Sequence, residues 1–371
     1  MDRISGTTDP HATTRFEADR REDVSAVMLA RGHGRQIDPR QHAFRHPLLP
    51  VALTPLIAYP LSWLADSGVT SQVVISAQDV TDAVSSWVRS RSFGDLSIDY
   101  WADAYPRGPA GTLKDAARLV PASRYVVVEG ARLPQIDLQD VLRSHRESGA
   151  AATMVVETER RRKAGMRERV PGGLYVFEQH ALDLVPSTGF HDIKQGLLEL
   201  VQRAGHGVHA YERSGLTPTV VDFATFGAVS RWLVETLADR SAQYPGFLPI
   251  FDGLRHPSAQ VASDVTIVGP VLIGAGARVD AQAVLVGPAV IGNDAVVETH
   301  ATVSRSVLLN GARVNDWAHV DGSVLLEHAV VGSRATVEDR VVGTERPTVR
   351  RGMRAVAVAS FRSAWPSTAA R

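Results

Sequence analysis

The chain has 371 residues, 44% of them hydrophobic, and its 40 basic and 40 acidic side chains give a formal net charge of zero. This length exceeds one ordinary hydrophobic core, so two domains are expected, and the charge balance argues against general nucleic-acid or anionic-membrane binding. The absence of cysteine excludes disulfides and thiolate metal ligands.

The N-terminal stretch, residues 1–23, is polar and charged and contains no apolar core of a secretory signal. We expect it to be a disordered tail. No run of about 18 apolar residues occurs in the chain, so no membrane span and no membrane partner is predicted. The expected location is cytoplasmic.

The first strand is expected at Val24–Ala30, before a loop that contains Gly32 and Gly34. Strands and helices then alternate to residue 160, which predicts βαβ units and a mostly parallel sheet covered on both faces. In such sheets ligands bind at the carboxyl ends of the strands, so the loops after Ala30 and Glu129 are candidate sites. The expected elements are helices at 56–67, 80–90 and 112–119 and strands at 72–76, 96–101, 125–129 and 151–156.

The alternation of strands and helices weakens in a basic run, Arg160–Lys163, which is typical of a solvated surface segment. Further elements are expected as strands at 172–177 and 208–212, a helix at 191–200, and a helix that Asp222 opens. The Pro- and Gly-rich stretch 244–249 predicts a domain boundary. The predicted parts are a tail at 1–23, an α/β domain at 24–240, a linker at 241–260, a repeat domain at 261–345 and a tail at 346–371.

From Val261 apolar residues recur every six positions, and a second column of alanines lies four residues further on. A six-residue period of this kind is the hexapeptide signature of a parallel β-helix, here with roughly four to five coils. The apolar column contains Val261, Ile267, Ile273, Val279, Leu285, Ile291, Val297 and Val303. The small column contains Ala277, Ala283, Ala289, Ala295 and Ala301.

The order of strand, glycine loop, Pro47–Val51 and helix resembles the opening of sugar-1-phosphate nucleotidyltransferases. The stretches 55–69, Gly108–Leu113 and Asp192–Leu197 match as well, and the resemblance covers about residues 25–342. It is strongest to the mannose-1-phosphate guanylyltransferase and glucose-1-phosphate adenylyltransferase branches. The resemblance implies a Rossmann-like mixed sheet followed by a left-handed β-helix. It also implies that a nucleotide contacts Ala30, Gly32, Gly34, Gly108, Gly111 and Thr112.

The phosphate-binding loop departs from the family pattern, which reads Leu-Ala-Gly-Gly-any-Gly-Thr-Arg-Leu. Arg31 replaces the first glycine, and Gln36 stands where the phosphate-binding arginine is expected. Arg35, one place earlier, and His46, which replaces a family lysine, are weak candidates for the lost cations. Lys163 is a weak candidate for the lysine that contacts the sugar phosphate.

The predicted metal site also departs from the family pattern. The family binds Mg²⁺ with an aspartate that closes a strand as Asn-Gly-Asp, and here Ala131 occupies that slot. Glu129 is a weak replacement, since it lies two residues back, about 6.6 Å along a strand. The second metal aspartate of the family corresponds to Asp222, which could equally be a helix N-terminal carboxylate. Mg²⁺ is therefore expected only if the protein is active.

Three functions follow as hypotheses. The first is a catalytically impaired binder of a nucleotide or nucleotide sugar, acting as a regulatory partner of an active paralogue. The second is an active transferase making an NDP-sugar for polysaccharide synthesis. The third is a structural assembly module, a homo-oligomer or hetero-oligomer built through the β-helix. Catalysis by His300, His319 or His328 is a further hypothesis, but these side chains fit surface or corner positions. Trp317 falls in a corner slot that favours polar residues, which makes it a candidate oligomer contact.

Overall fold

The computed structural model describes residues 23–343 except 31–46, 69, 71, 78–81, 103–106, 161–166 and 238–242. The contacts divide the chain into two compact units. The first comprises Met1–Arg31 and Tyr59–Thr217, and the second comprises Gly32–Ala58 and Pro218–Arg371. The sequence placed residues 32–58 and 218–240 in the α/β domain, whereas their contacts group them with the β-helix. The predicted Gly32 and Gly34 loop, Arg35, His46 and Lys163 lie outside the described residues.

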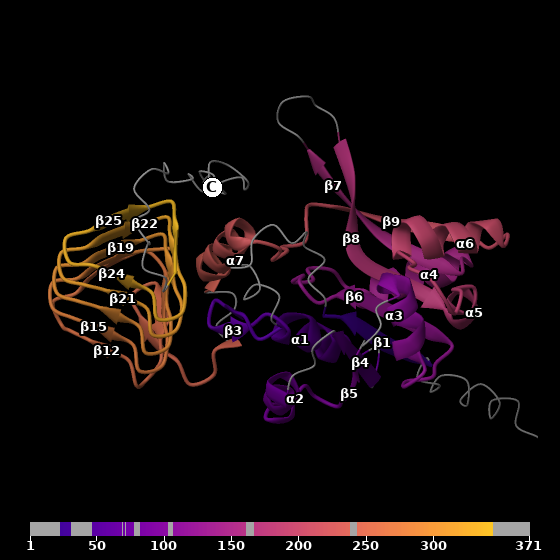
Figure 1. The fold of residues 1–371 in the computed structure, drawn as a ribbon, viewed down its shortest axis with the longest axis horizontal. Coiled ribbons are helices and arrows are strands. Elements are labelled where there is room, and N and C mark those ends of the chain that lie inside the picture. Colours follow the sequence, from indigo (N-terminus) through magenta and orange to yellow (C-terminus); the bar gives the residue numbers. More distant parts are fainter. Residues whose placement is uncertain are drawn as a thin grey trace, which may run out of the picture. The chain divides into compact units, whose positions relative to one another are not determined.

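The first unit is built on a seven-stranded mixed sheet of order β5-β4-β1-β6-β8-β7-β9 (Figure 1). Strands β5, β4, β1 and β6 are parallel, β8 is antiparallel to β6 and β7, and β9 is parallel to β7. The strands are β1 (Val24–Leu29), β4 (Gln72–Ala77), β5 (Ser97–Ala102), β6 (Arg124–Glu129), β7 (Ala152–Arg160), β8 (Arg167–Glu178) and β9 (Val208–Ser214). The predicted mixed α/β sheet is therefore confirmed.

Helices flank this sheet because their apolar sides need a partner surface. They are α1 (Ala58–Ser67), α2 (Asp82–Arg89), α3 (Gly108–Ala117), α4 (Leu138–Ser148), α5 (Gln179–Asp183), the π-helical segment η2 (Ile193–Leu197) and α6 (Leu198–Arg203). Helix α3 packs on β1 and β4. The buried cluster between them includes Leu29, Leu113, Tyr175 and Phe177. The sequence missed α4 and α5.

Two predicted segments differ from the structure. The helix expected at 191–200 begins with η2, where Asp192 caps the start by accepting bonds from the backbone amides of Lys194 and Gln195, and continues as α6. The basic run was predicted as a solvated surface segment, and its first residue, Arg160, ends β7 and pairs with Arg167 of β8. Residues 161–163 lie outside the described residues.

The second unit contains the parallel β-helix (Figure 1). The β-helix already begins at β11, since Leu254 pairs with Leu272 in the first sheet, so the predicted linker at 241–260 is partly β-structure. The β-helix has three parallel sheets. The first contains β11 (Gly253–Arg255), β14 (Val271–Ile273), β17 (Ala289–Ile291), β20 (Val307–Leu308), β23 (Val324–Leu325) and β26 (Val341–Val342). The second contains β12 (Gln260–Val261), β15 (Arg278–Val279), β18 (Val296–Val297), β21 (Arg313–Val314) and β24 (Val330–Val331), and the third contains β13 (Thr266–Val268), β16 (Val284–Val286), β19 (Thr302–Ser304), β22 (His319–Asp321) and β25 (Thr336–Glu338). Strand β10 (Leu248–Ile250) precedes them antiparallel to β11.

The apolar and alanine columns of the sequence form the interior of the β-helix. Leu285, Ile291, Val297 and Ala301 are fully buried. The repeat shortens by one residue partway along the β-helix. Leu272 and its partner Val290 are 18 residues apart, whereas Val290 and Val307 are 17 apart, and the later coils keep 17 residues. The predicted parallel β-helix is confirmed.

The same unit holds the hairpin of β2 (Pro50–Val51) and β3 (Thr54–Pro55) and the helix α7 (Phe223–Glu235). Helix α7 contacts β2, β17 and β20. The hydroxyl of Tyr244 donates to the carbonyl of Ala52 at 2.8 Å. These contacts explain why residues 47–58 group with the β-helix and not with the sheet.

Candidate functional site

The carboxyl ends of β1, β4 and β6 meet in a tight backbone arrangement. The amide of Ala30 donates to the carbonyl of Ser76 at 2.8 Å, and the amide of Gly130 donates to that of Leu29 at 2.9 Å. A side chain at Gly130 would place its Cβ 3.0 Å from the Cα of Ala30, so only glycine fits without displacement. Ala30, the first predicted nucleotide contact, therefore lies at the strand edge where α/β sheets bind ligands.

The predicted loop Gly108–Leu113 is the first turn of α3 and not a loop. Gly108 has φ +80°, and a Cβ there would lie 2.5 Å from the carbonyl oxygen of His191. That carbonyl accepts a bond from the amide of Ala110 at 3.0 Å, and the amide of His191 donates to Arg107 at 2.7 Å. Gly111 and Thr112 are buried. The start of α3 is therefore held against the segment before η2 through backbone contacts that require glycine.

A row of polar side chains lies under α3 near this edge. The strand register aligns Trp101, Ser76, Leu29 and Glu129 across β5, β4, β1 and β6, so these side chains point to the same face of the sheet. Leu29 packs with residues of α3, which identifies that face. The hydroxyl of Ser76 and the indole nitrogen of Trp101 are buried without a hydrogen-bond partner among the described residues.

Tyr175 adds a third unpartnered polar atom to this region. Its ring is buried and stacks on Phe177, and its hydroxyl has no partner among the described residues. Burial raises the pKa of Tyr175 far above its usual range, and the charge of Glu129 raises it further. The hydroxyl therefore stays protonated. Buried polar groups normally form hydrogen bonds. Three buried polar atoms without a described partner near one end of the strands therefore indicate a position where water or a ligand binds.

Glu129, the predicted replacement metal ligand, is paired with a cation of its own chain. The Nε atom of Arg132 donates to Oε2 of Glu129 at 2.9 Å, and its Nη2 atom donates to the carbonyl of Pro171 at 3.3 Å. Gly173 makes room for this pair, because a Cβ there would lie 2.1 Å from Nε of Arg132 and 2.7 Å from Oε2 of Glu129. The structure thus accommodates the ion pair through a glycine with φ +68°.

Asp222, in the second unit, caps the first turn of α7. Its Oδ1 atom accepts bonds from the amide and the hydroxyl of Thr225, each at 2.8 Å, and the Thr225 hydroxyl accepts from the amide of Asp222 at 3.0 Å. This reciprocal pattern is a capping box. The structure therefore gives Asp222 the helix-terminal role that the sequence left open beside the metal role.

These residues do not fit a magnesium site. Mg²⁺ prefers carboxylates and water in octahedral geometry. Here Ala131 has no ligand atom, Glu129 is bonded to Arg132, and Asp222 is bonded to Thr225. Within the part of the chain that the structure describes, no three His, Asp or Glu side chains gather as a metal site.

The β-helix histidines considered in the sequence occupy corners or outer strand positions. His300 and Trp317 both have positive φ, and their rings stack at 4.0 Å between centroids. Trp317 is 55% exposed. His328 lies at a third positive-φ corner, against Gly311.

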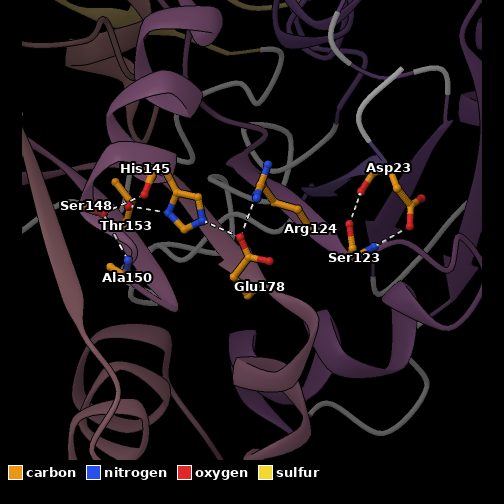
Figure 2. Close-up of polar contacts among 8 residues, drawn as sticks. All are labelled: Asp23, Ser123, Arg124, His145, Ser148, Ala150, Thr153 and Glu178. Atoms are coloured by element: carbon orange, nitrogen blue, oxygen red, sulfur yellow. Dashed lines mark hydrogen bonds and ion pairs between the residues drawn. The ribbon is translucent and has the colours of Figure 1, made fainter. Parts of the chain in front are cut away.

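The sequence missed a polar cluster at the opposite edge of the sheet (Figure 2). Arg124 begins β6, Glu178 ends β8, and His145 lies on α4. Oε1 of Glu178 accepts from Nε of Arg124 at 2.8 Å and from Nε2 of His145 at 2.9 Å, and Nδ1 of His145 bonds the hydroxyl of Thr153 at 2.7 Å. No sequence motif links these positions, because they come from four separate elements. The antiparallel pairing of β6 with β8 places Arg124 opposite Glu178.

The protonation of this cluster follows from its contacts. Burial would raise the pKa of Glu178, but the bonds from Arg124 and His145 outweigh it and lower the pKa of that carboxyl. Burial lowers the pKa of His145, and the nearby charge of Arg124 lowers it further, against the opposing bond to Glu178. Glu178 is therefore ionised and His145 neutral near pH 7, with the His145 proton on Nε2.

Comparison with known proteins agrees with this architecture of a nucleotidyltransferase-type domain joined to a β-helix. Residues 25–169 match the nucleotidyl transferase family, and residues 256–359 match the family described as GMPPB C-terminal domain. The chain belongs to the sugar-1-phosphate nucleotidyltransferase family. The predicted resemblance is thereby confirmed.

Individual relatives are similar over most of their length. The UTP–glucose-1-phosphate uridylyltransferase of Synechocystis is 23% identical over 364 residues, covering 86% of this chain and 87% of that protein. The probable mannose-1-phosphate guanylyltransferase 3 of Oryza sativa is 24% identical, covering 86% and 90%. The mannose-1-phosphate guanylyltransferase of Mycobacterium tuberculosis is 24% identical, covering 69% and 76%. Among the described residues, no helix has both the length and the apolar character needed to cross a bilayer.

Proposed function

We propose that this protein binds a nucleotide or nucleotide sugar at the carboxyl-end edge of its sheet and does not turn it over at an ordinary rate. In this role it acts as a regulatory partner of an active relative. The support for binding is the tight backbone edge at Ala30 and Gly130 and the unpartnered polar atoms of Ser76, Trp101 and Tyr175 under α3.

The observation that carries the loss of turnover is the ion pair of Glu129 with Arg132. Nucleotidyl transfer needs little covalent chemistry from a protein, so its rate depends on positive charge placed at the phosphates. Where a metal would be held at the end of β6, the one remaining carboxylate is neutralised by a guanidinium 2.9 Å away. Arg132 therefore supplies the local positive charge without the ligand geometry that orients a leaving pyrophosphate.

A thermal-shift screen tests the binding. Purified full-length protein is heated with GDP-mannose, UDP-glucose, ADP-glucose or dTDP-glucose, in either Mg²⁺ or EDTA. A ligand of the folded state at roughly one hundred times its Kd stabilises by about 2.7 kcal/mol, which shifts Tm by several degrees. We expect at least one ligand to give the same shift in Mg²⁺ and in EDTA. A shift seen only in Mg²⁺ contradicts the metal-free site, and no shift with any ligand contradicts binding.

A variant pair sharpens this test. Ala131→Asp restores a carboxylate at the family's metal position, and Ala131→Ser is a control of similar size without the charge. We expect the aspartate variant alone to make ligand binding sensitive to EDTA. If the parent chain is already as sensitive as Ala131→Asp, the proposed role of Arg132 is wrong.

An active transferase is the second candidate, and one observation favours it. The relatives named as uridylyl- and guanylyltransferases align with 86% of the chain, without restriction to either domain. Turnover would then need a metal held in another way. Release of pyrophosphate from a nucleoside triphosphate and a hexose 1-phosphate separates the two functions.

A further inference from the structure

A cavity of about 290 Å³ lies beside the Arg124–Glu178–His145 cluster, at the sheet edge opposite the proposed nucleotide site. Arg124 is the first residue of β6, whereas Glu129 and Ala30 lie at the other end of the sheet. The cavity is also lined by Arg146, His180 and His206 and by the backbone of residues 149–151 and 207. Its size is at the lower end of that of small-molecule sites.

Among the described residues that line the cavity, Glu178 is the one acidic side chain, and it is already hydrogen-bonded. Glu178 accepts from both Arg124 and His145 through one oxygen (Figure 2). The charges of Arg124 and Glu178 therefore offset each other. The remaining ionisable lining groups are Arg146, His180 and His206, all of which are neutral or positive. This composition favours an anion over a cation.

The two histidines make the anion preference specific. The rings of His180, on α5, and His206, after α6, lie 4.9 Å apart between centroids, with their planes tilted by 60°. The ring nitrogens of two adjacent histidines can both donate to the oxygens of one bound anion. Imidazolium and guanidinium donors form short, charge-assisted bonds with phosphate oxygens.

We propose that this cavity binds a small oxyanion of the phosphate class, held by Arg146, His180 and His206. The site is separate from the nucleotide-binding edge and does not depend on the proposed function. A phosphate group that enters here contacts side chains from α4, α5 and the turn after α6.

Among the described residues, no three side chains that could hold a metal ion gather at this cavity. Both ring nitrogens of His145 are bonded, to Thr153 and to Glu178, so this ring offers no lone pair to a metal. Two groups on the adjoining elements are also paired. Arg203 of α6 is paired with Glu199 at 3.2 Å, and His209 of β9 bonds the hydroxyl of Ser144 at 2.9 Å.

The test is an NMR titration of the histidine ring signals of the full-length protein with orthophosphate, at constant ionic strength set with chloride. We expect saturable shifts of the His180 and His206 signals as orthophosphate is added. Chloride alone produces no such shifts. Shifts that do not saturate, or that chloride reproduces, overturn the proposal.

Variants of the lining residues show which side chains bind the phosphate. His180→Gln with His206→Gln should abolish the saturable response, and Arg146→Gln should weaken it. His328→Asn is the matched control in the β-helix, because asparagine tolerates the positive φ of 57° there, and it should leave phosphate binding unchanged. If the double variant loses its folded signals, Arg146→Gln and the two single glutamine variants decide.

Two further probes identify the source of the phosphate group. Pyrophosphate and glucose 1-phosphate are titrated in the same way, and the tighter one indicates whether a free or a sugar-linked phosphate is preferred. Arg132→Gln should leave each response intact. Loss of the response in Arg132→Gln assigns it to the nucleotide edge and overturns the second site.

Discussion

The β-helix and the mixed sheet place their important side chains by different rules. In the β-helix, Leu285 pairs with its neighbours one coil away, and the same local repeat positions Ile267 and Val303 above and below it. In the sheet, Glu178 meets Arg124 and His145 from positions 54 and 33 residues away. A repeated local pattern therefore encodes the β-helix, whereas long-range pairing creates the sites of the sheet unit.

Shortening one buried side chain in each unit should give the largest losses of stability. It also compares the locally encoded β-helix with the sheet unit, whose sites depend on long-range pairing. Phe177 and Leu285 are both fully buried. We expect Phe177→Ala to cost about 3–5 kcal/mol and Leu285→Ala about 2–5 kcal/mol in chemical unfolding. Solenoid coils contact only their neighbours, so the second loss should act mainly on the β-helix transition. Val268→Ala, at a side chain 55% exposed, is the control and should change stability by about 0.5 kcal/mol or less.

A pair of glycines tests the Glu129–Arg132 arrangement. Gly173 and Gly68 have similar positive φ, +68° and +63°, but only Gly173 is crowded, since a Cβ at Gly68 meets nothing within 4 Å. Both alanine variants should lose about 1–2 kcal/mol from backbone strain. Gly173→Ala should lose about 1–2 kcal/mol more, because Arg132 must move. Equal losses in the two variants show that Arg132 is not fixed by this contact.

The pH dependence of stability tests the other edge of the sheet. The folded pKa of His145 is lowered, mainly by burial, so its contribution is complete above the unfolded pKa near 6.5 and is lost as the pH falls below it. The folded pKa of Glu178 is lowered as well, and its contribution is lost at still lower pH. We expect the free energy of unfolding to fall from pH 7 to pH 5.

His145→Gln is the matched variant for this dependence. It should cost about 1–3 kcal/mol near pH 7 through the bonds to Thr153 and Glu178, and it should flatten the decline between pH 7 and 5.5. Urea unfolding at a series of pH values measures both. A decline of the same size in the variant assigns the pH dependence to other groups.

The smallest expected effect concerns Asp222. Asp222→Ala removes the cap of α7 and should cost about 1 kcal/mol, whereas Asp222→Asn keeps an acceptor at the cap and should cost a few tenths. Both are measured by chemical unfolding in EDTA and in Mg²⁺. If Mg²⁺ stabilises the parent protein and Asp222→Asn removes that gain, Asp222 is a metal ligand as well as a cap.

The sequence predicts those features that depend on local pattern. The six-residue period located the interior of the β-helix, and the apolar stretch 24–30 located β1, at whose end we propose the nucleotide site. The start of α3 was predicted four residues late, at Thr112, because Gly108 and Gly111 are poor helix formers and the contact of Gly108 with His191 is not visible in the local sequence.

The residues that distinguish this chain within its family were harder to predict. Ala131 stands out from the family motif, but its neighbour Arg132 gave no signal. Glu129 is only three residues from Arg132, whereas Pro171 and Gly173 approach Arg132 from strand β8. The cavity at His180 and His206 was missed because these two residues lie in separate elements, and no motif encodes such long-range contacts.

The most direct test of the central claim is a pyrophosphate-release assay on the purified full-length protein. It contains each nucleoside triphosphate with mannose 1-phosphate or glucose 1-phosphate and Mg²⁺, after the thermal-shift screen has identified a bound nucleotide sugar. We predict binding of that nucleotide sugar without measurable pyrophosphate release. Turnover of roughly one per second, at the low end of ordinary enzymes, would contradict the account.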